Sequence, residues 1–412
     1  MIEENNIPGF SISVCDKEKI IFSDTCGFTD LSKNIPVNST TQFGLQSISK
    51  TYTAFGFILA VHNGKVSLDD SVKKYVPDFY VRHMDGEDYS SAITFRQCLS
   101  HRTGLKHEAP IGSNYNYNGT FDEHIKSING TFLRFKPGKQ YSYSNLGIDL
   151  AAYTLGKIYN MSFEDYMRIK VFEPLEMVNS TFKQDDYLMR IDGAVGHGKT
   201  PLVKYPIMMI GAGGMYSCPD DMTHFIRCFL NQGVYKDQRI INQEILEQMY
   251  NEYPATEEYP YNLGLVVGLR NGERILNHNG GGFGFLAAQD ILIDRGFGAV
   301  ALTNSTEHNN IHITIIRCNI WDDLIALQDA KKDDCDPLPD SYKNLIGMYE
   351  ARYMNGDSWK LAVIPRNGGI YCNYEKLEHQ SGNLYFNKNN DCIEFIENGM
   401  IYDNVTLFKR TE

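Results

Sequence analysis

Ser47 and Lys50 stand three residues apart, directly before the apolar run Thr51–Val61. Residues at this spacing share one face of a helix, so the lysine amine can reach the serine oxygen. The start of a helix also offers unpaired backbone N–H groups and the positive end of the helix dipole, which stabilise negative charge. Because the run that follows is apolar enough to be buried, a nucleophile, a candidate base and part of an oxyanion site could come from four consecutive residues.

The spacing alone is not specific. Two other pairs repeat it, Ser71–Lys74 and Ser180–Lys183. The ordinary interpretation of an isolated pair is a serine that caps a helix and a lysine in solvent. The first pair differs because two further short motifs follow it along the chain, Tyr143-Ser144-Asn145 and His278-Asn279-Gly280.

The order Ser-x-x-Lys, Tyr-x-Asn and His/Lys-x-Gly is the active-site set of the serine β-lactamase and penicillin-binding-protein-like family, which this chain resembles. It is most similar to the branch of class C β-lactamases, D-amino-acid peptidases and esterases. The resemblance runs from about residue 7 to about residue 325. Framework stretches also agree with it: Ile7–Gly9, Ile93–Leu105, Phe172–Met177 and Gly213–Ser217.

The resemblance implies that Ser47 is the nucleophile and that Lys50 and Tyr143 move protons. A serine hydroxyl needs an adjacent base at neutral pH. Lys50 can serve if burial holds its amine partly neutral. A nearby ammonium could in turn lower the pKa of the Tyr143 phenol. Which of the two groups is the formal base therefore stays open.

The resemblance also implies a set of residues for substrate binding and the oxyanion hole: Asn145, His278, Asn279, Gly280 and Gly281. Asn145 would orient Lys50 and the substrate amide, and it could also cap the helix predicted over Leu146–Tyr159. The N–H of Gly281 would pair with that of Ser47 to hold an oxyanion. Lysine, which attracts a substrate carboxylate, is usual where His278 stands. A histidine that is neutral or only partly charged disfavours β-lactam hydrolysis and favours ester, amide or D-peptide substrates.

Strand-like alternation at both ends of the first part of the chain encloses mostly helical sequence. Strands are predicted over 9–23, 263–269, 274–278, 285–293 and 298–304, with a closing helix over 311–327. The pattern predicts an α+β fold, and the resemblance implies the β-lactamase/transpeptidase-like arrangement, an antiparallel β-sheet flanked by helices with a helical subdomain. A charged, proline-bearing linker at 331–339 divides this domain, 1–330, from a small all-β, barrel-like domain over 340–412 that is lipocalin-like.

Composition excludes several classes of partner. The formal net charge of −12 and the lack of a basic run argue against nucleic acid. No 18-residue apolar stretch could span a membrane. Residues 1–6 carry no signal segment, so we expect a cytoplasmic protein as the chain is written, or an exported one if an upstream signal has been removed. Nine cysteines without a Cys-x-x-Cys pair indicate reduced thiols. The oligomeric state is not indicated.

Other candidate sites are weaker. His308 and His312 have the spacing of helical metal ligands, but no third ligand is evident. His101 and Arg102 fit the end of a helix. We therefore expect no metal and no cofactor.

These observations favour a serine hydrolase that acts through an acyl-enzyme on a small amide, D-peptide or ester, that is, on a small-molecule or short-peptide substrate. One alternative is a β-lactamase or penicillin-binding protein. Another is a non-catalytic sensor of β-lactams or cell-wall peptides, although a pure binder need not keep the proton carriers Lys50 and Tyr143. A third alternative gives the main role to the C-terminal β-domain, as a module that binds a partner.

Overall fold

The computed structural model describes residues 7–113, 119–198, 207–270, 273–306, 320–321, 324–325, 340–352, 358–366, 369–372, 375–387, 392–402 and 406–410. The chain divides into two compact units, Met1–Ile316 and Arg317–Glu412. The linker predicted at 331–339, His308, His312 and most of the helix predicted over 311–327 lie outside the described residues. The predicted division into 1–330 and 340–412 stays a prediction.

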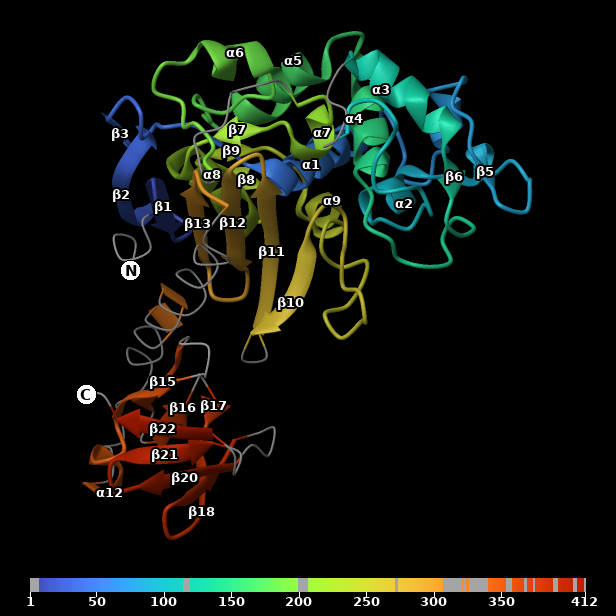
Figure 1. Ribbon diagram of the computed structural model, residues 1–412. Coiled ribbons are helices and arrows are strands. Elements are labelled where there is room, and N and C mark those ends of the chain that lie inside the picture. Colours follow the sequence, from blue (N-terminus) through green and yellow to red (C-terminus); the bar gives the residue numbers. More distant parts are fainter. Residues whose placement is uncertain are drawn as a thin grey trace. The chain divides into compact units, whose positions relative to one another are not determined.

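Among the described residues, an antiparallel sheet of seven strands organises the first unit, in the order β10-β11-β12-β13-β1-β2-β3 (Figure 1). The strands are β1 (Gly9–Cys15), β2 (Ile20–Asp30), β3 (Ile35–Pro36), β10 (Val266–Arg270), β11 (Glu273–Gly282), β12 (Phe285–Leu292) and β13 (Phe297–Thr303). The two ends of the unit meet where β1 pairs with β13, from Phe10↔Thr303 to Cys15↔Gly298. This arrangement confirms the predicted fold class.

Helices and short strands connect β3 to β10. The helices are α1 (Ser49–His62), α2 (Phe95–Leu99), α3 (Phe121–Ser127), α4 (Asn145–Tyr159), α5 (Phe163–Met167), α6 (Gln184–Met189), α7 (Ile210–Gly213), α8 (Pro219–Leu230) and α9 (Gln243–Glu247). Strands of two residues pair as β4 (Phe43–Gly44) with β7 (Tyr216–Ser217), β5 (Arg82–His83) with β6 (Phe132–Leu133), and β8 (Val234–Tyr235) with β9 (Gln238–Arg239). Among the described residues, no helix combines the length and the apolar composition needed to cross a bilayer.

Helix α1 is buried along nearly its whole length, from Ser49 to Ala60. A helix that is apolar on all sides is stable only in the interior of a protein. Helix α8 lies against β1 and β13 of the sheet. Helix α1 contacts α8 where the rings of Tyr52 and Phe225 lie 4.2 Å apart between centres. Figure 1 shows α1 behind the upper ends of β11 and β12.

The polar side chains in the first turns of α1 bind segments that are far away in the chain. The hydrogen bonds are Met215 N to Ser49 Oγ at 3.0 Å, Thr51 Oγ1 to Gly264 O at 2.7 Å, Tyr52 Oη to Gln289 Oε1 at 2.9 Å and Thr53 Oγ1 to Gly211 O at 2.7 Å. Buried polar groups need such partners. The start of α1 is thereby fixed against the sheet and against the segments that precede β7 and β10.

The second unit contains a separate antiparallel sheet, in the order β17-β16-β15-β14-β22-β21-β20-β19-β18. Its elements are α12 (Asp340–Lys343), β14 (Gly347–Arg352), β15 (Ser358–Arg366), β16 (Gly369–Cys372), β17 (Glu375–Lys376), β18 (Glu378–Ser381), β19 (Leu384–Phe386), β20 (Cys392–Ile396), β21 (Gly399–Tyr402) and β22 (Thr406–Arg410). Buried residues that include Leu361, Val363, Phe395 and Phe408 form its core. The prediction of strands in this part of the chain is confirmed.

Replacing Tyr52 by phenylalanine should destabilise the first unit by about 1–3 kcal/mol, because the buried Gln289 oxygen would lose its donor. The measurement is the shift of the unfolding midpoint in urea. Tyr80→Phe is the matched control, because the Tyr80 side chain is 37% exposed. Equal midpoints for the two variants would show that the Tyr52–Gln289 bond does not stabilise the fold.

Candidate active site

Ser47 lies in the short 3₁₀ helix η1 (Gln46–Ile48), between β4 and α1. Gln46, directly before it, has a φ of 51°, a left-handed conformation that non-glycine residues seldom adopt. Ser47 is only partly buried, whereas Gln46 and Ile48 on either side are buried. The sharp turn into α1 therefore leaves the serine as the residue of η1 that reaches the surface.

Lys50 lies in the first turn of α1 and its side chain is fully buried. Its Nζ donates to Ser47 Oγ at 3.1 Å and to the backbone oxygen of Ala212 at 2.8 Å. Burial lowers the pKa of Lys50 to about 7, although the charge of Asp149 raises it. A large part of the amine is thus unprotonated near neutral pH, which is the state that a base requires.

The two other pairs with the same spacing have ordinary structural roles. Ser71 caps the 3₁₀ helix Val72–Lys74, and Lys74 pairs with Asp70 at 2.9 Å. Ser180 bonds to Asp221, and Lys183 pairs with Asp165 at 2.9 Å. Of the three pairs, it is Ser47–Lys50 in which the amine is buried and bonded to its own serine.

Tyr143 lies beside this pair. The Lys50 amine is 4.8 Å from the centre of the Tyr143 ring. Burial raises the pKa of Tyr143, and the nearby Ser47 hydroxyl only partly opposes this shift. The expectation that the pKa of this phenol is lowered was therefore wrong, because the loss of water around the ring outweighs the effect of Ser47.

Asn145 is buried near the same place, but its bonds differ from the expected ones. It is the first residue of α4, and the residue at the N-cap is Ser144, so the prediction that Asn145 caps this helix was wrong. Its amide donates to the sulfur of Met209 at 3.3 Å. Among the described residues, the Lys50 amine donates hydrogen bonds to Ser47 and Ala212, so the structure does not show Asn145 orienting it.

His278 lies on β11 and is 6% exposed. Its Nδ1 is 2.7 Å from the Asn279 carbonyl oxygen, so this nitrogen carries the hydrogen. Its Nε2 lies 2.9 Å from the Tyr261 hydroxyl and accepts from it. Burial, helped by the charge of Lys50, lowers the pKa of His278 to about 3. The ring is neutral at pH 7, and both of its nitrogens have protein partners.

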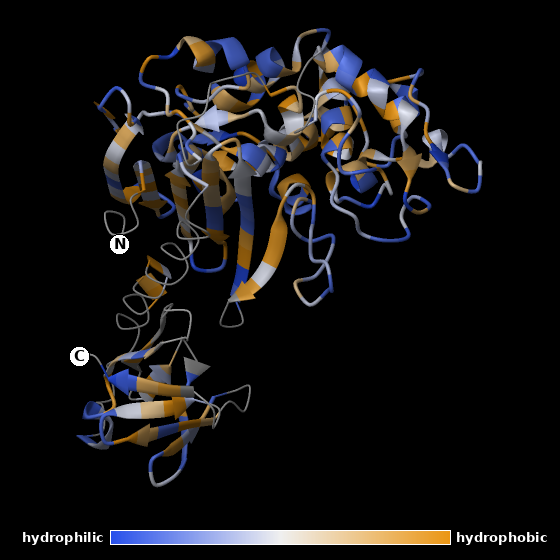
Figure 2. Ribbon diagram, viewed as in Figure 1, coloured by the Kyte–Doolittle hydropathy of each residue, from blue (hydrophilic) through white to orange (hydrophobic). Residues whose placement is uncertain are grey.

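The glycines of β11 lie against η1. Strand β10 pairs with β11 only as far as Asn277, so residues 278–282 have β12 on one side and the serine segment near the other. A Cβ on Gly280 would fall 2.0 Å from the Leu45 oxygen and 3.1 Å from the Ser47 nitrogen. Gly281 is exposed, and Asn279 has a buried Oδ1 that accepts no hydrogen bond from the described residues. Figure 2 shows β11 as more hydrophilic than β12 and β13 beside it.

His101 also belongs to this neighbourhood. Its φ of 59°, just after the end of α2, fits the predicted helix end. Its ring also makes contacts with the loop that carries Tyr143. Nδ1 accepts from the backbone N–H of Ser144 at 3.2 Å, and the ring lies 4.3 Å from those of Tyr143 and Tyr261. His101 therefore fixes the loop that carries Tyr143. The sequence offered no local signal for this contact, because it joins two segments about forty residues apart.

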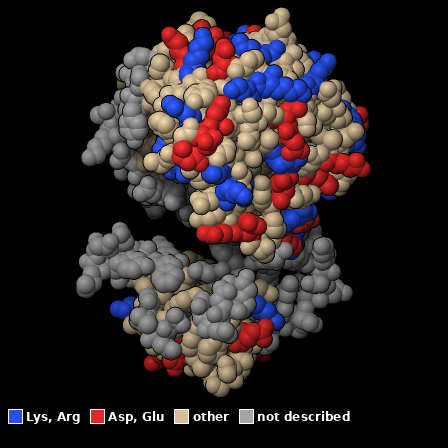
Figure 3. All heavy atoms as spheres, turned by 90° about the vertical axis from the view of Figure 1, so that its right-hand side faces the viewer, with Lys and Arg blue, Asp and Glu red and all other residues tan. Residues whose placement is uncertain are grey.

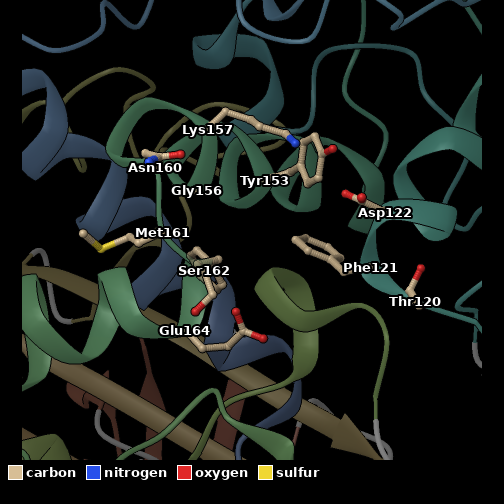
Figure 4. A pocket seen from close by; sticks show the side chains of 11 residues that line it. Thr120, Phe121, Asp122, Tyr153, Gly156, Lys157, Asn160, Met161, Ser162 and Glu164 are labelled. Carbon is tan, nitrogen blue, oxygen red and sulfur yellow. The ribbon is translucent and has the colours of Figure 1, made fainter.

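Two cavities lie away from Ser47. One of about 600 Å³ opens between α3, the C-terminal half of α4 and the start of α5, and Figure 4 shows Phe121, Asp122, Tyr153 and Lys157 around it. None of the predicted site residues lines it. A smaller one of about 400 Å³ includes Arg102, Tyr141 and Tyr259.

The described residues hold no group of three or more His, Cys, Asp or Glu side chains placed to bind a metal ion. Figure 3 shows acidic and basic side chains interspersed over one face of the molecule, with no broad patch of one sign among the residues described there.

Comparison with known proteins places the chain in a family. The family model described as Beta-lactamase matches residues 1–314, so the chain belongs to the Beta-lactamase family of serine hydrolases. A solved structure titled as the octameric penicillin-binding protein homologue from Pyrococcus abyssi has the same fold, with a TM-score of 0.67 and 20% identity over 99% of this chain and 97% of that one.

Curated relatives match at low identity. Protein flp from Staphylococcus aureus strain MW2 is 26% identical over 311 residues, which are 74% of this chain and 61% of that protein. Beta-lactamase-like protein 2 from Dictyostelium discoideum is 30% identical over 248 residues, 56% of this chain and 44% of that protein. The chain spans about three fifths of the length of the first of these relatives.

Gly280→Ala should destabilise the first unit by about 1–3 kcal/mol, because the added methyl group would overlap the Leu45 oxygen. Gly281→Ala is the control, since its methyl group would meet only the end of the Leu286 side chain at 3.2 Å. Thermal unfolding of both variants checks this. A smaller loss at Gly280 than at Gly281 would contradict the close approach of β11 to η1.

Proposed function

We propose that this chain is a serine hydrolase that acts through an acyl-enzyme at Ser47 on a small amide, D-peptide or ester substrate. The proposal rests chiefly on one observation: a fully buried lysine amine, with a pKa of about 7, is hydrogen-bonded to a partly exposed serine hydroxyl. Such a pair is an activated nucleophile with its base in place.

In the proposed reaction Ser47 Oγ bonds to the carbonyl carbon of the substrate while its proton passes to Lys50 Nζ. Because burial keeps the Tyr143 phenol protonated, Lys50 is the better candidate for the base and Tyr143 for the acid. Tyr143 gives its proton to the leaving group as the bond to the carbonyl carbon breaks, and Lys50 returns a proton to Tyr143. Water then attacks the acyl-enzyme by the reverse proton path, which releases the acid and restores Ser47.

The strand β11 would bind the substrate and its developing negative charge. The backbone N–H groups of Ser47 and Gly281 are the proposed oxyanion donors, supported by the contact of Gly280 with η1. The Asn279 Oδ1, which accepts no hydrogen bond from the described residues, and the Asn145 amide nitrogen, which donates to the Met209 sulfur, are the proposed contacts for a substrate amide. His278 would act indirectly, by holding the Tyr261 hydroxyl.

The alternative of β-lactam hydrolysis has less support. A neutral, internally bonded His278 stands where a lysine would attract the carboxylate of a β-lactam. The alternative of a non-catalytic sensor has less support too, because the Ser47–Lys50 pair is assembled for proton transfer.

Ser47→Ala should lower labelling by a fluorophosphonate, and turnover of p-nitrophenyl acetate, by at least about 10³-fold. Ser71→Ala is the matched control, because Ser71 has the same spacing to a lysine but only caps a short helix. The fluorophosphonate should label the Ser71→Ala variant at the same rate as the unchanged protein. Labelling that survives in Ser47→Ala would refute the proposed function.

The rate of labelling should rise with pH through about 7, because Lys50 takes up the serine proton only when it is unprotonated. Below this value the rate should fall about tenfold for each pH unit. The measurement is the second-order rate constant of labelling between about pH 5 and about pH 9. A rate that stays constant down to about pH 5 would exclude Lys50 as the base.

A further inference from the structure

Behind Lys50 lies a second pair of ionisable side chains, His124 on α3 and Asp149 on α4. Both side chains are fully buried, and His124 Nε2 is 3.1 Å from Asp149 Oδ2. A buried carboxylate is costly unless it is paired and hydrogen-bonded. None of the motifs in the sequence drew attention to either residue, and both lie outside the proposed proton path.

The contacts of His124 define its charge. Its Nδ1 lies 2.6 Å from the Ile111 carbonyl oxygen, which can only accept a hydrogen bond. Its Nε2 faces the Asp149 carboxylate, which also accepts when ionised. The ring therefore carries a hydrogen on each nitrogen. Burial lowers the pKa of His124, but Asp149, the Ile111 carbonyl and Glu108 together outweigh burial, and the net shift of the pKa is upward.

Asp149 connects this pair to the candidate site through one backbone residue. Asp149 Oδ1 accepts from the Ala212 N–H at 3.0 Å, and the Ala212 oxygen accepts from Lys50 Nζ at 2.8 Å. Helix α7, which carries Ala212, is packed so closely on α4 that a Cβ on Gly211 would fall 2.5 Å from that of Ala152. The chain of contacts thus runs from His124 through Asp149 and Ala212 to Lys50 and Ser47.

The other charged and titratable groups around these residues complete the electrostatic setting. Glu108 acts on His124 and raises its pKa. His101, His107 and His278 face Lys50, and its charge lowers the pKa of each. Asp149 is the group that acts on Lys50 in the opposite direction. A carboxylate without a counter-charge at this position would hold a proton on the lysine amine.

We propose that Asp149 and His124 are positioning residues for Lys50: Asp149 holds the Ala212 backbone that binds the amine, and His124 balances the carboxylate so that the amine can release its proton. The inference rests on the proposed function of Lys50 as the base for Ser47. His124 acts through Asp149, because the hydrogen bonds of its ring among the described residues are with Asp149 and the Ile111 carbonyl.

The test is the pH dependence of fluorophosphonate labelling in three variants of the full chain. The acid limb of each profile is the pH range in which the labelling rate falls as the pH is lowered. His124→Gln leaves the carboxylate without its counter-charge, so the acid limb should move up by about one pH unit. Asp149→Asn removes the carboxylate, so the limb should move down. In the double variant the limb should follow Asp149→Asn, since His124 has no carboxylate left to balance. A purely structural pair would lower the yield or the melting temperature without moving the limb.

Asp122→Asn is the matched control, because Asp122 lies on the same helix two residues from His124 but is exposed and borders the separate cavity of Figure 4. Its acid limb should stay where it is in the unchanged protein. If Asp149→Asn does not fold, the pH profile of His124→Gln alone tests the proposal, because the proposal requires the acid limb of this profile to move to higher pH.

An unmoved limb in His124→Gln overturns the proposal, and so does a shift in Asp149→Asn in the same direction as in His124→Gln. The Ser47→Ala variant separates this failure from failure of the proposed function. If labelling depends on Ser47 but the limb does not move, the positioning role alone is lost. If labelling does not depend on Ser47, the proposed function itself is refuted, and the positioning role that rests on it is refuted with it.

Discussion

The desolvation of a single amine, Lys50 Nζ, is the constraint on which the rest of the structure depends. An ammonium in the protein interior is strongly unfavourable unless its surroundings compensate it or it loses its proton. Here one hydroxyl and one backbone carbonyl accept from the amine, and Asp149 only partly offsets the effect of burial. The Lys50 amine can remain in this state because α1 is enclosed on all sides by the sheet and the surrounding helices.

The buried start of α1 also holds the neighbouring segments in place through hydrogen bonds. Ser49, Thr51, Tyr52 and Thr53 each bond to a different part of the chain, so the start of α1 fixes the segments around Ala212, Gly264 and Gln289 together. Because η1 directly precedes α1, the fixed start of α1 also fixes the position of Ser47. The glycine part of β11 can then approach η1, since β10 no longer pairs with β11 beyond Asn277.

The sequence predicted much of this arrangement, for reasons that differ between residues. Ser47 and Lys50 are linked by helix geometry alone, and alternation of apolar residues predicted the strands of both units. The convergence of Tyr143 and His278 on this pair came from the family resemblance. The shift in the pKa of Tyr143, the bond of Asn145 to Met209, the contact of His101 with Ser144 and the pair behind Lys50 were not predictable, because each depends on burial created by segments distant in the chain.

The close approach at Gly280 has a consequence for how such a site can diversify. The backbone of this strand leaves no room for any side chain at position 280 facing Leu45, so this part of the candidate site is closed to variation. New specificities in descendants of this chain, natural or selected in the laboratory, would then have to arise at other positions around the site, such as Tyr141, whose ring lies 6.1 Å from that of His101.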